Sequence, residues 1–225
     1  LPVDRQLTYL CGANRDGIHY PGPRVNLSPA QMAARIELKA FAAIEHPSPL
    51  EVESHTIDIQ ILPGVLDVRA TMQLANRSKF AYVGDSQSGE SLETLCLSIP
   101  KGFERVTFSK EFHGRRFNVI DGKLVTDIPW PPGERTLEFR YRLPITEGTA
   151  FTRKLDLPTS HVHMRVSGEN CQSVSANLVA EVQNDSEATF ASDDSLPAGH
   201  VVQLQLTRAA VPWITYGRWS AVGLL

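Results

Sequence analysis

The sequence lacks the features that identify most enzymes and nucleic-acid-binding proteins. It contains no GxSxG, HExxH, P-loop or GxGxxG motif, so the common hydrolase, metalloprotease and nucleotide-binding chemistries find no support. Its 22 lysines and arginines form no run and are balanced by 25 acidic residues, which argues against a surface for nucleic acid. These absences predict a chain that is not an enzyme, needs no cofactor and has no nucleic-acid partner.

Cysteine is scarce, and its spacing matches no metal-binding pattern. The three residues, Cys11, Cys96 and Cys171, are widely separated and include no CxxC pair. Cys96 lies between two leucines in an apolar alternation, which favours a small buried side chain. A disulfide between Cys96 and Cys171 is the alternative, and spacing alone does not decide it because a disulfide requires a specific geometry.

What the chain does contain is a regular alternation of apolar and polar residues. From Leu66 to Leu74 every even-numbered residue is apolar and every odd-numbered one polar, and the pattern returns in 137–143 and 202–206. A period of two indicates strands with one buried and one exposed face. Seven or so short strands at this spacing predict an all-β fold, an immunoglobulin-like antiparallel β-sandwich with a second, smaller set of strands. The expected core comprises Leu66, Val68, Ala70, Met72, Leu74, Leu95, Leu97, Ile99, Leu137, Phe139 and Tyr141.

A proline-rich stretch, residues 46–49, predicts a linker, because proline cannot continue a regular element. We expect the sandwich over residues 50–147 and a smaller β unit packed on it over residues 148–208. The sequence leaves open whether that unit is a separate sandwich or adds strands to the first. Residues 34–41 fit both helical and strand periodicity, and their β-rich surroundings favour a strand. A further single strand is expected over residues 176–182.

Two histidines are the best candidates for a metal site. His161 and His163 are two residues apart in a predicted strand, so both side chains leave the same face. Val162, Met164 and Val166 occupy the opposite, apolar face, so the histidines are expected to face solvent. The sequence shows no evident third ligand, although His200 or His113 could approach in space, and we predict no metal site.

Other polar and aromatic groups have simple structural explanations. Asn184-Asp185 and Asp193-Asp194 lie in polar loops without the spacing of a calcium loop, which favours turn chemistry. Trp130 lies between prolines, where it could stack on a sugar but more simply caps a proline-rich turn. A carbohydrate- or metal-binding module is therefore the alternative function.

Several stretches resemble a β domain of bacterial membrane-anchored surface or periplasmic proteins. They are Gly-Val-Leu-Asp-Val, Leu-Ala-Asn-Arg-Ser and Tyr-Val-Gly within 64–84, Leu-Ser-Ile-Pro-Lys-Gly-Phe at 97–103, and Pro-Pro-Gly-Glu-Arg-Thr-Leu-Glu-Phe-Arg-Tyr-Arg-Leu-Pro at 131–144. In that group the domain follows a carboxypeptidase-regulatory-like (transthyretin-like) domain and precedes a membrane helix. The resemblance implies that residues 1–46, with Asp-Gly-Ile-His-Tyr at 16–20, are the last strands of such an upstream domain. It brings no catalytic residues.

The end of the sequence carries a cluster of interfacial aromatic residues. Trp213, Tyr216 and Trp219 are of the kind that favours the headgroup zone of a bilayer. We expect residues 209–225 to begin a membrane-proximal or transmembrane segment that continues past residue 225; the alternative is a tail packed on the sandwich. The resulting hypothesis is a non-enzymatic, extracytoplasmic module in the periplasm or on the cell surface. It would be anchored to a membrane and act as a spacer or bind an unidentified protein partner.

Overall fold

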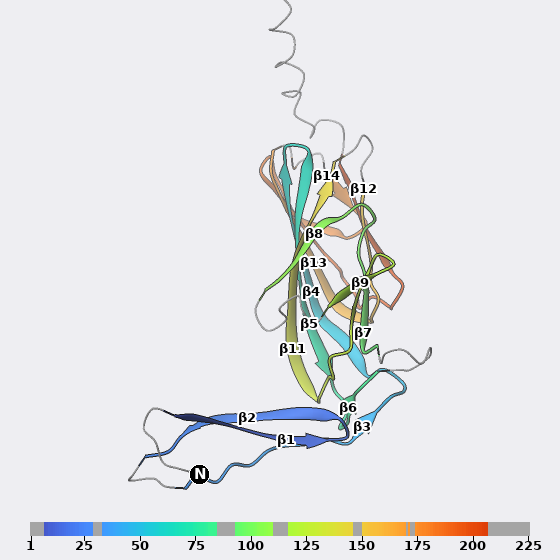
Figure 1. The fold of residues 1–225 in the computed structure, drawn as a ribbon. Helices are drawn as coiled ribbons and strands as arrows, with labels where there is room; N and C mark the ends of the chain where they lie inside the picture. The colour runs from blue at the N-terminus through green and yellow to red at the C-terminus, as the bar shows by residue number, and fades with distance from the viewer. Residues whose placement is uncertain are drawn as a thin grey trace, which may run out of the picture.

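The computed structural model describes residues 7–28, 33–84, 93–109, 117–145, 150–169, 171 and 174–206. Within these ranges the chain forms strands, turns and loops, and no α-helix is present (Figure 1). The strands form two facing layers with one hydrophobic core between them. The prediction of an all-β sandwich is therefore confirmed.

One layer is a seven-stranded sheet that runs the length of the sandwich. All its neighbouring strands are antiparallel except β4 and β13, which are parallel over eight residue pairs from Thr159↔Val52 to Ser167↔Gln60. The strands, in spatial order, are β15 (Val179–Gln183), β16 (Glu187–Ala191), β13 (Thr159–Ser167), β4 (Leu50–Leu62), β5 (Val65–Asn76), β11 (Gly133–Pro144) and β8 (Glu104–Ser109).

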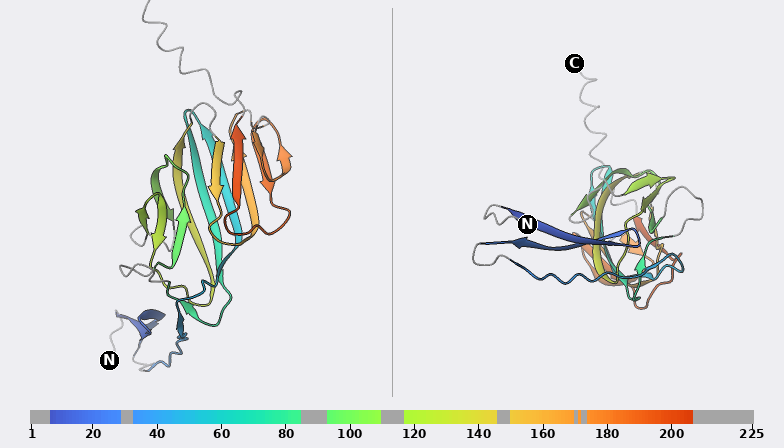
Figure 2. Two further views of the ribbon diagram at one scale, coloured as in Figure 1. Left: turned by 90° about the vertical axis from the view of Figure 1, so that its right-hand side faces the viewer. Right: turned by 60° about the horizontal axis from the view of Figure 1, so that its bottom comes forward.

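The facing layer consists of two three-stranded sheets that cover the same side of the large sheet (Figure 2). The first sheet is β7 (Leu95–Ser98), β10 (Lys123–Thr126) and β9 (Asn118–Ile120), and the second is β12 (Ala150–Lys154), β17 (Val201–Leu206) and β14 (Val174–Ala176). The Asp156 carboxylate links the two sheets, because it accepts hydrogen bonds from the backbone N–H and the hydroxyl of Ser98 at 2.7 and 2.6 Å.

The strands after residue 148 extend the first sandwich and form no second one. β13, β15 and β16 join the seven-stranded sheet, and β12, β14 and β17 face it. Val162, Phe151 and Leu204 belong to the same core cluster as Val68 and Leu97. The alternative that the sequence left open is thus resolved in favour of additional strands.

The predicted core is confirmed in full, since each of its eleven side chains is at most 7% exposed. β4 shows how strand irregularities set which residues are inside. Leu50 and Val52 point inward, a register shift follows between Val52 and Ser54, and the buried residues then become His55, Ile57 and Ile59.

A separate hairpin lies across one end of the sandwich (Figure 1). It pairs β1 (Thr8–Arg15) with β2 (Ile18–Asn26), and its turn residues Asp16 and Gly17 both have positive φ, 52° and 76°, as a type I′ turn requires. The short parallel pair of β3 (Ala43–Ile44) and β6 (Ala81–Tyr82) joins it to the sandwich, and the peptide bond before Pro47 is cis. The assignment of residues 1–46 to an upstream domain stays a prediction.

Two strand predictions are wrong. Residues 34–41 form no strand. At the end of this segment two carbonyl groups accept hydrogen bonds from side chains of the hairpin: Arg15 donates to the Ala40 oxygen at 3.2 Å and Tyr20 to that of Phe41 at 3.1 Å. The single strand expected over 176–182 is two strands, β14 and β15, in different layers. Asn177 lies where the chain passes from one layer to the other, and its side chain fixes this position: it donates to the Val201 oxygen at 2.8 Å and accepts from the Gln203 N–H at 2.7 Å.

Candidate functional site

The predicted orientation of the two histidines is confirmed. His161 and His163 are exposed on β13, and Val162, Met164 and Val166 between and beyond them are buried. Their partners on β4 are Ser54 and Thr56. Among the residues that the structure describes, no three His, Cys, Asp or Glu side chains are grouped closely enough to hold a metal ion.

We expect zinc titration to show no tight one-to-one binding at this position. Two imidazoles without further ligands cannot complete the four-coordinate sphere that zinc prefers. Calorimetry on the wild-type protein is the direct measurement. A tight single site that disappears in both His161→Ala and His163→Ala would contradict this prediction.

The remaining predicted groups divide into structural ones and ones outside the described ranges. Trp130 is 2% exposed, and the guanidinium carbon of Arg135 lies 5.7 Å from the centroid of the Trp130 ring. Trp130 therefore caps a turn and is not presented to a sugar. Asn184 accepts hydrogen bonds from the Ser186 and Glu187 N–H groups, which confirms the turn interpretation. Trp213, Tyr216 and Trp219 lie outside the described residues. No described segment is an apolar helix long enough to cross a bilayer.

The cysteines are free, so the disulfide between Cys96 and Cys171 is not formed. Cys171 is completely buried, and Cys96 is half-buried. Burial raises the pKa of both thiols, which lowers their reactivity at neutral pH.

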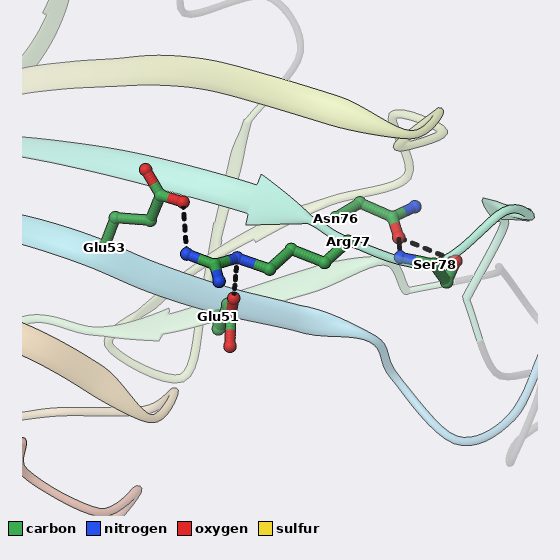
Figure 3. A network of polar contacts seen from close by, with 5 residues as sticks. All are labelled: Glu51, Glu53, Asn76, Arg77 and Ser78. Carbon is green, nitrogen blue, oxygen red and sulfur yellow. Dashed lines mark hydrogen bonds and ion pairs between the residues drawn. The ribbon is translucent and has the colours of Figure 1, made fainter.

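The solvent-facing side of the seven-stranded sheet carries charged groups that pair with one another. Arg140 donates from Nε and Nη2 to the two carboxylate oxygens of Asp67, each at 2.5 Å, and Arg142 approaches the same carboxylate at 3.5 Å. Arg165 on β13 donates to Asp58 on β4 at 2.9 Å. A second network lies at the end of β5 (Figure 3): Arg77 contacts Glu51 at 2.5 Å and Glu53 at 2.7 Å.

The opposite charges within these pairs compensate one another, so the pairs stabilise the sheet. The hydrogen bond from Arg140 holds the pKa of Asp67 below its ordinary value. The nearby charges of Arg140 and Arg142 also lower this pKa, whereas burial of the carboxylate acts in the opposite direction. The two oxygens of Asp67 are thus occupied by guanidinium groups, which argues against this carboxylate as a general acid or base.

Asp67→Asn is expected to lower the free energy of unfolding at pH 7 by on the order of 1 kcal/mol, because the arginine heads are half exposed. The folded state has the lower pKa, so the contribution is present above the ordinary value of 3.8 and disappears as the pH falls through the folded value. Urea unfolding of the wild type and of Asp67→Asn at pH values from 7 to 3 should show that the difference between their free energies of unfolding becomes smaller as the pH falls. Asp16→Asn, in an exposed turn, is the control, and a pH-independent difference would contradict the argument.

The interior contains a group of polar side chains, two of which, His55 and Arg153, sequence reasoning missed. His55 on β4, Tyr141 on β11 and Arg153 on β12 are at most 2% exposed, and we call them the inner polar cluster. The Arg153 guanidinium lies 5.8 Å from the ring centroid of Phe139. The alternation of the strands does indicate their burial. His55 lies on the same strand face as Ile57 and Ile59, and Arg153 lies on the same face as Phe151 and Leu155.

Burial dominates the acid–base properties of this cluster. It lowers the pKa of His55 to about 3, with the Arg153 charge acting in the same direction, so the imidazole is neutral at pH 7. It raises the pKa of Tyr141 to about 12, which the Arg153 charge opposes. Arg153 is therefore the charged member of the cluster.

A groove of about 600 Å³ separates β12 from the segment that follows β7. Lys101 and Lys154 stand on opposite sides of it, and its most buried lining residues are Leu143 and Phe151. These two lie two residues from Tyr141 and Arg153 on the same strand faces. The groove thus leads toward the inner polar cluster, although Arg153 does not line it.

No protein-family model matches this chain, and no curated protein matches its sequence. Three similar solved structures are a yeast LTA4 hydrolase (10% identity, TM-score 0.44), a putative protease from Parabacteroides distasonis (10%, 0.45) and a two-domain M1 zinc metallopeptidase bound to L-tryptophan (12%, 0.41). The matches cover 70, 72 and 71% of this chain but 29, 41 and 43% of those proteins. The chain therefore spans less than half of each, and no functional assignment follows.

Proposed function

We propose that this chain is a non-enzymatic, immunoglobulin-like β-sandwich module that acts as a spacer or protein-interaction domain next to a membrane, outside the cytoplasm. One observation carries the proposal: the chain enters and leaves the sandwich at opposite ends. The β1–β2 hairpin and the start of β4 lie at one end, and β17 finishes at the other, where β4 turns into β5 (Figures 1 and 2). The thirteen residues of β4 separate these ends by roughly 40 Å.

Such an arrangement keeps whatever precedes the sandwich away from whatever follows it. The charges on the large sheet support this role, because the acidic groups Asp58, Asp67, Glu51 and Glu53 all have cationic partners within the sheet. The sites weighed from the sequence, the histidine pair and Trp130, offer neither a ligand set nor an exposed ring. The spacer is therefore favoured over a carbohydrate- or metal-binding module.

The location can be tested with a membrane-impermeant maleimide on intact cells that make the full-length protein. Cys11 is half-buried on the hairpin and should be labelled, as resolved by peptide mass spectrometry, while buried Cys171 should react only after unfolding. Cys11→Ser is the control for specificity. Labelling of Cys11 only after lysis, or recovery of the protein in the soluble fraction without detergent, would contradict an anchored extracytoplasmic module.

A further inference from the structure

The inner polar cluster contains hydrogen-bonding groups that the protein leaves unused. Nε and Nη1 of Arg153 and both ring nitrogens of His55 are buried without a hydrogen-bond partner. Arg153 also forms no ion pair in the part of the chain that the structure describes. Buried polar groups in folded proteins are nearly always satisfied, so each exception points to a bound water, an ion or a functional role.

The charge of Arg153 decides between these explanations. A guanidinium carries five N–H donors and is always charged, and burying it without a counter-charge is costly. The face of Phe139 provides partial electrostatic compensation, but an aromatic ring accepts no strong hydrogen bond from the in-plane N–H groups. A water molecule could accept those hydrogen bonds, yet it would leave the positive charge uncompensated between two apolar layers.

We propose that the inner polar cluster binds a small monovalent anion between the two layers. The Nε and Nη1 hydrogens of Arg153 are its main ligands, and a ring N–H of His55 is the further donor. The anion connects β12 in one layer with β4 in the other, so it supplies a polar link across an otherwise apolar core.

The charge and size of the ligand follow from its surroundings. Arg153 provides one positive charge, and His55 remains neutral because burial lowers its pKa to about 3, so one negative charge balances the site. The cluster lies in a core of large buried side chains, with Phe139 directly beside Arg153, and such surroundings favour a small ion over an extended organic acid. Chloride is the physiological ion with the required chemistry, and bromide or nitrate can replace it in the laboratory.

The groove beside β12 gives the direction of approach. Lys101 and Lys154 line it and no acidic residue does. Its most buried lining residues, Leu143 and Phe151, lie two residues along their strands from Tyr141 and Arg153. Two lysines at a groove of low dielectric raise the local concentration of anions. Neither lysine is a ligand in this proposal.

Bromide is the best probe because its position can be seen directly. A crystal of the wild-type protein grown in sodium bromide should show an anomalous peak within hydrogen-bond distance of Arg153 Nε and Nη1. A peak on the surface alone, that is, an adventitious ion only, or water at Arg153 would overturn the proposal. This measurement does not depend on whether any variant folds.

Stability provides the second measurement. When gluconate is replaced by bromide at constant ionic strength, the wild-type Tm should rise by roughly 5 °C once bromide exceeds its Kd a hundredfold. Arg153→Met removes the charge at similar length, so its Tm should be independent of bromide. Arg69→Met, on the solvent-facing side of β5, should respond as the wild type does. Equal bromide responses in all three proteins would overturn the proposal, as would a wild-type Tm that does not change.

Discussion

Val68→Asp is expected to abolish the folded state. Val68 is fully buried in the middle of β5, where its neighbours across the sheet are Tyr141 on β11 and Ile59 on β4. A carboxylate there would have no cationic partner, so the group would take up a proton. Even the neutral carboxyl group costs several kcal/mol to bury in an apolar core. Because a domain is stable by only about 5–15 kcal/mol, this one change should remove most or all of the stability.

The matched control is Val119→Asp, which makes the same chemical change on β9 at a side chain that is 53% exposed. Circular dichroism and urea unfolding should show a cooperative transition for the control and for the wild type, but none for Val68→Asp. If Val68→Asp unfolded at the wild-type urea concentration, the assignment of this face to the core would be wrong.

Asn76→Asp is expected to be the second most damaging change, although the two side chains have nearly the same shape. Asn76 is buried, and its Nδ2 donates to the carbonyl oxygens of Phe80 and Trp130 at 2.9 and 2.7 Å. Its Oδ1 accepts from the Ser78 N–H and hydroxyl (Figure 3). A carboxylate would place an unpaired negative charge against two carbonyl oxygens, at a cost of about 3 kcal/mol.

The pH dependence distinguishes this mechanism from a general loss of packing. The new carboxyl would have a raised pKa in the folded state, because only its protonated form can donate to a carbonyl. The folded state would then hold the proton more tightly, so the deficit of Asn76→Asp should be larger at pH 7 than at pH 4. Asn118→Asp, at an exposed position on β9, should stay within about 0.5 kcal/mol of the wild type at both values. A pH-independent deficit would contradict the explanation.

Alternation was sufficient to identify the core, because a strand buried on one side must repeat with a period of two. It placed Leu66 to Leu74 and Leu137 to Tyr141 on the correct face, and it turned His161 and His163 outward. The Asp-Gly pairs at 16 and 121 are a sequence signal for tight hairpin turns, and in the structure all four residues have positive φ.

Features that depend on distant partners could not be predicted in this way. Alternation continues through Asn177, although the chain changes layer there, because both β14 and β15 are strands. The apolar–polar alternation of β4 and β13 would be the same with a parallel or an antiparallel neighbour, so the sequence could not predict that these two strands pair in parallel. His55 and Arg153 of the inner polar cluster were missed for a similar reason: they interrupt apolar patterns, and a polar residue at such a position is ordinarily assigned to a bulge or an edge.

The parallel pairing of β4 with β13 has a consequence for how the chain reaches its native state. β4 and β5 are joined by a tight turn and can pair as soon as both are synthesised, but the other side of β4 receives its neighbour from residues 159–167. The contact between Asp58 and Arg165 alone spans 107 residues. Until β13 has left the ribosome, β4 therefore presents an open edge of unpaired backbone N–H and C=O groups, the kind of edge on which partly made chains aggregate. Because β4 and β13 are so far apart in the sequence, their pairing should be a slow step of folding.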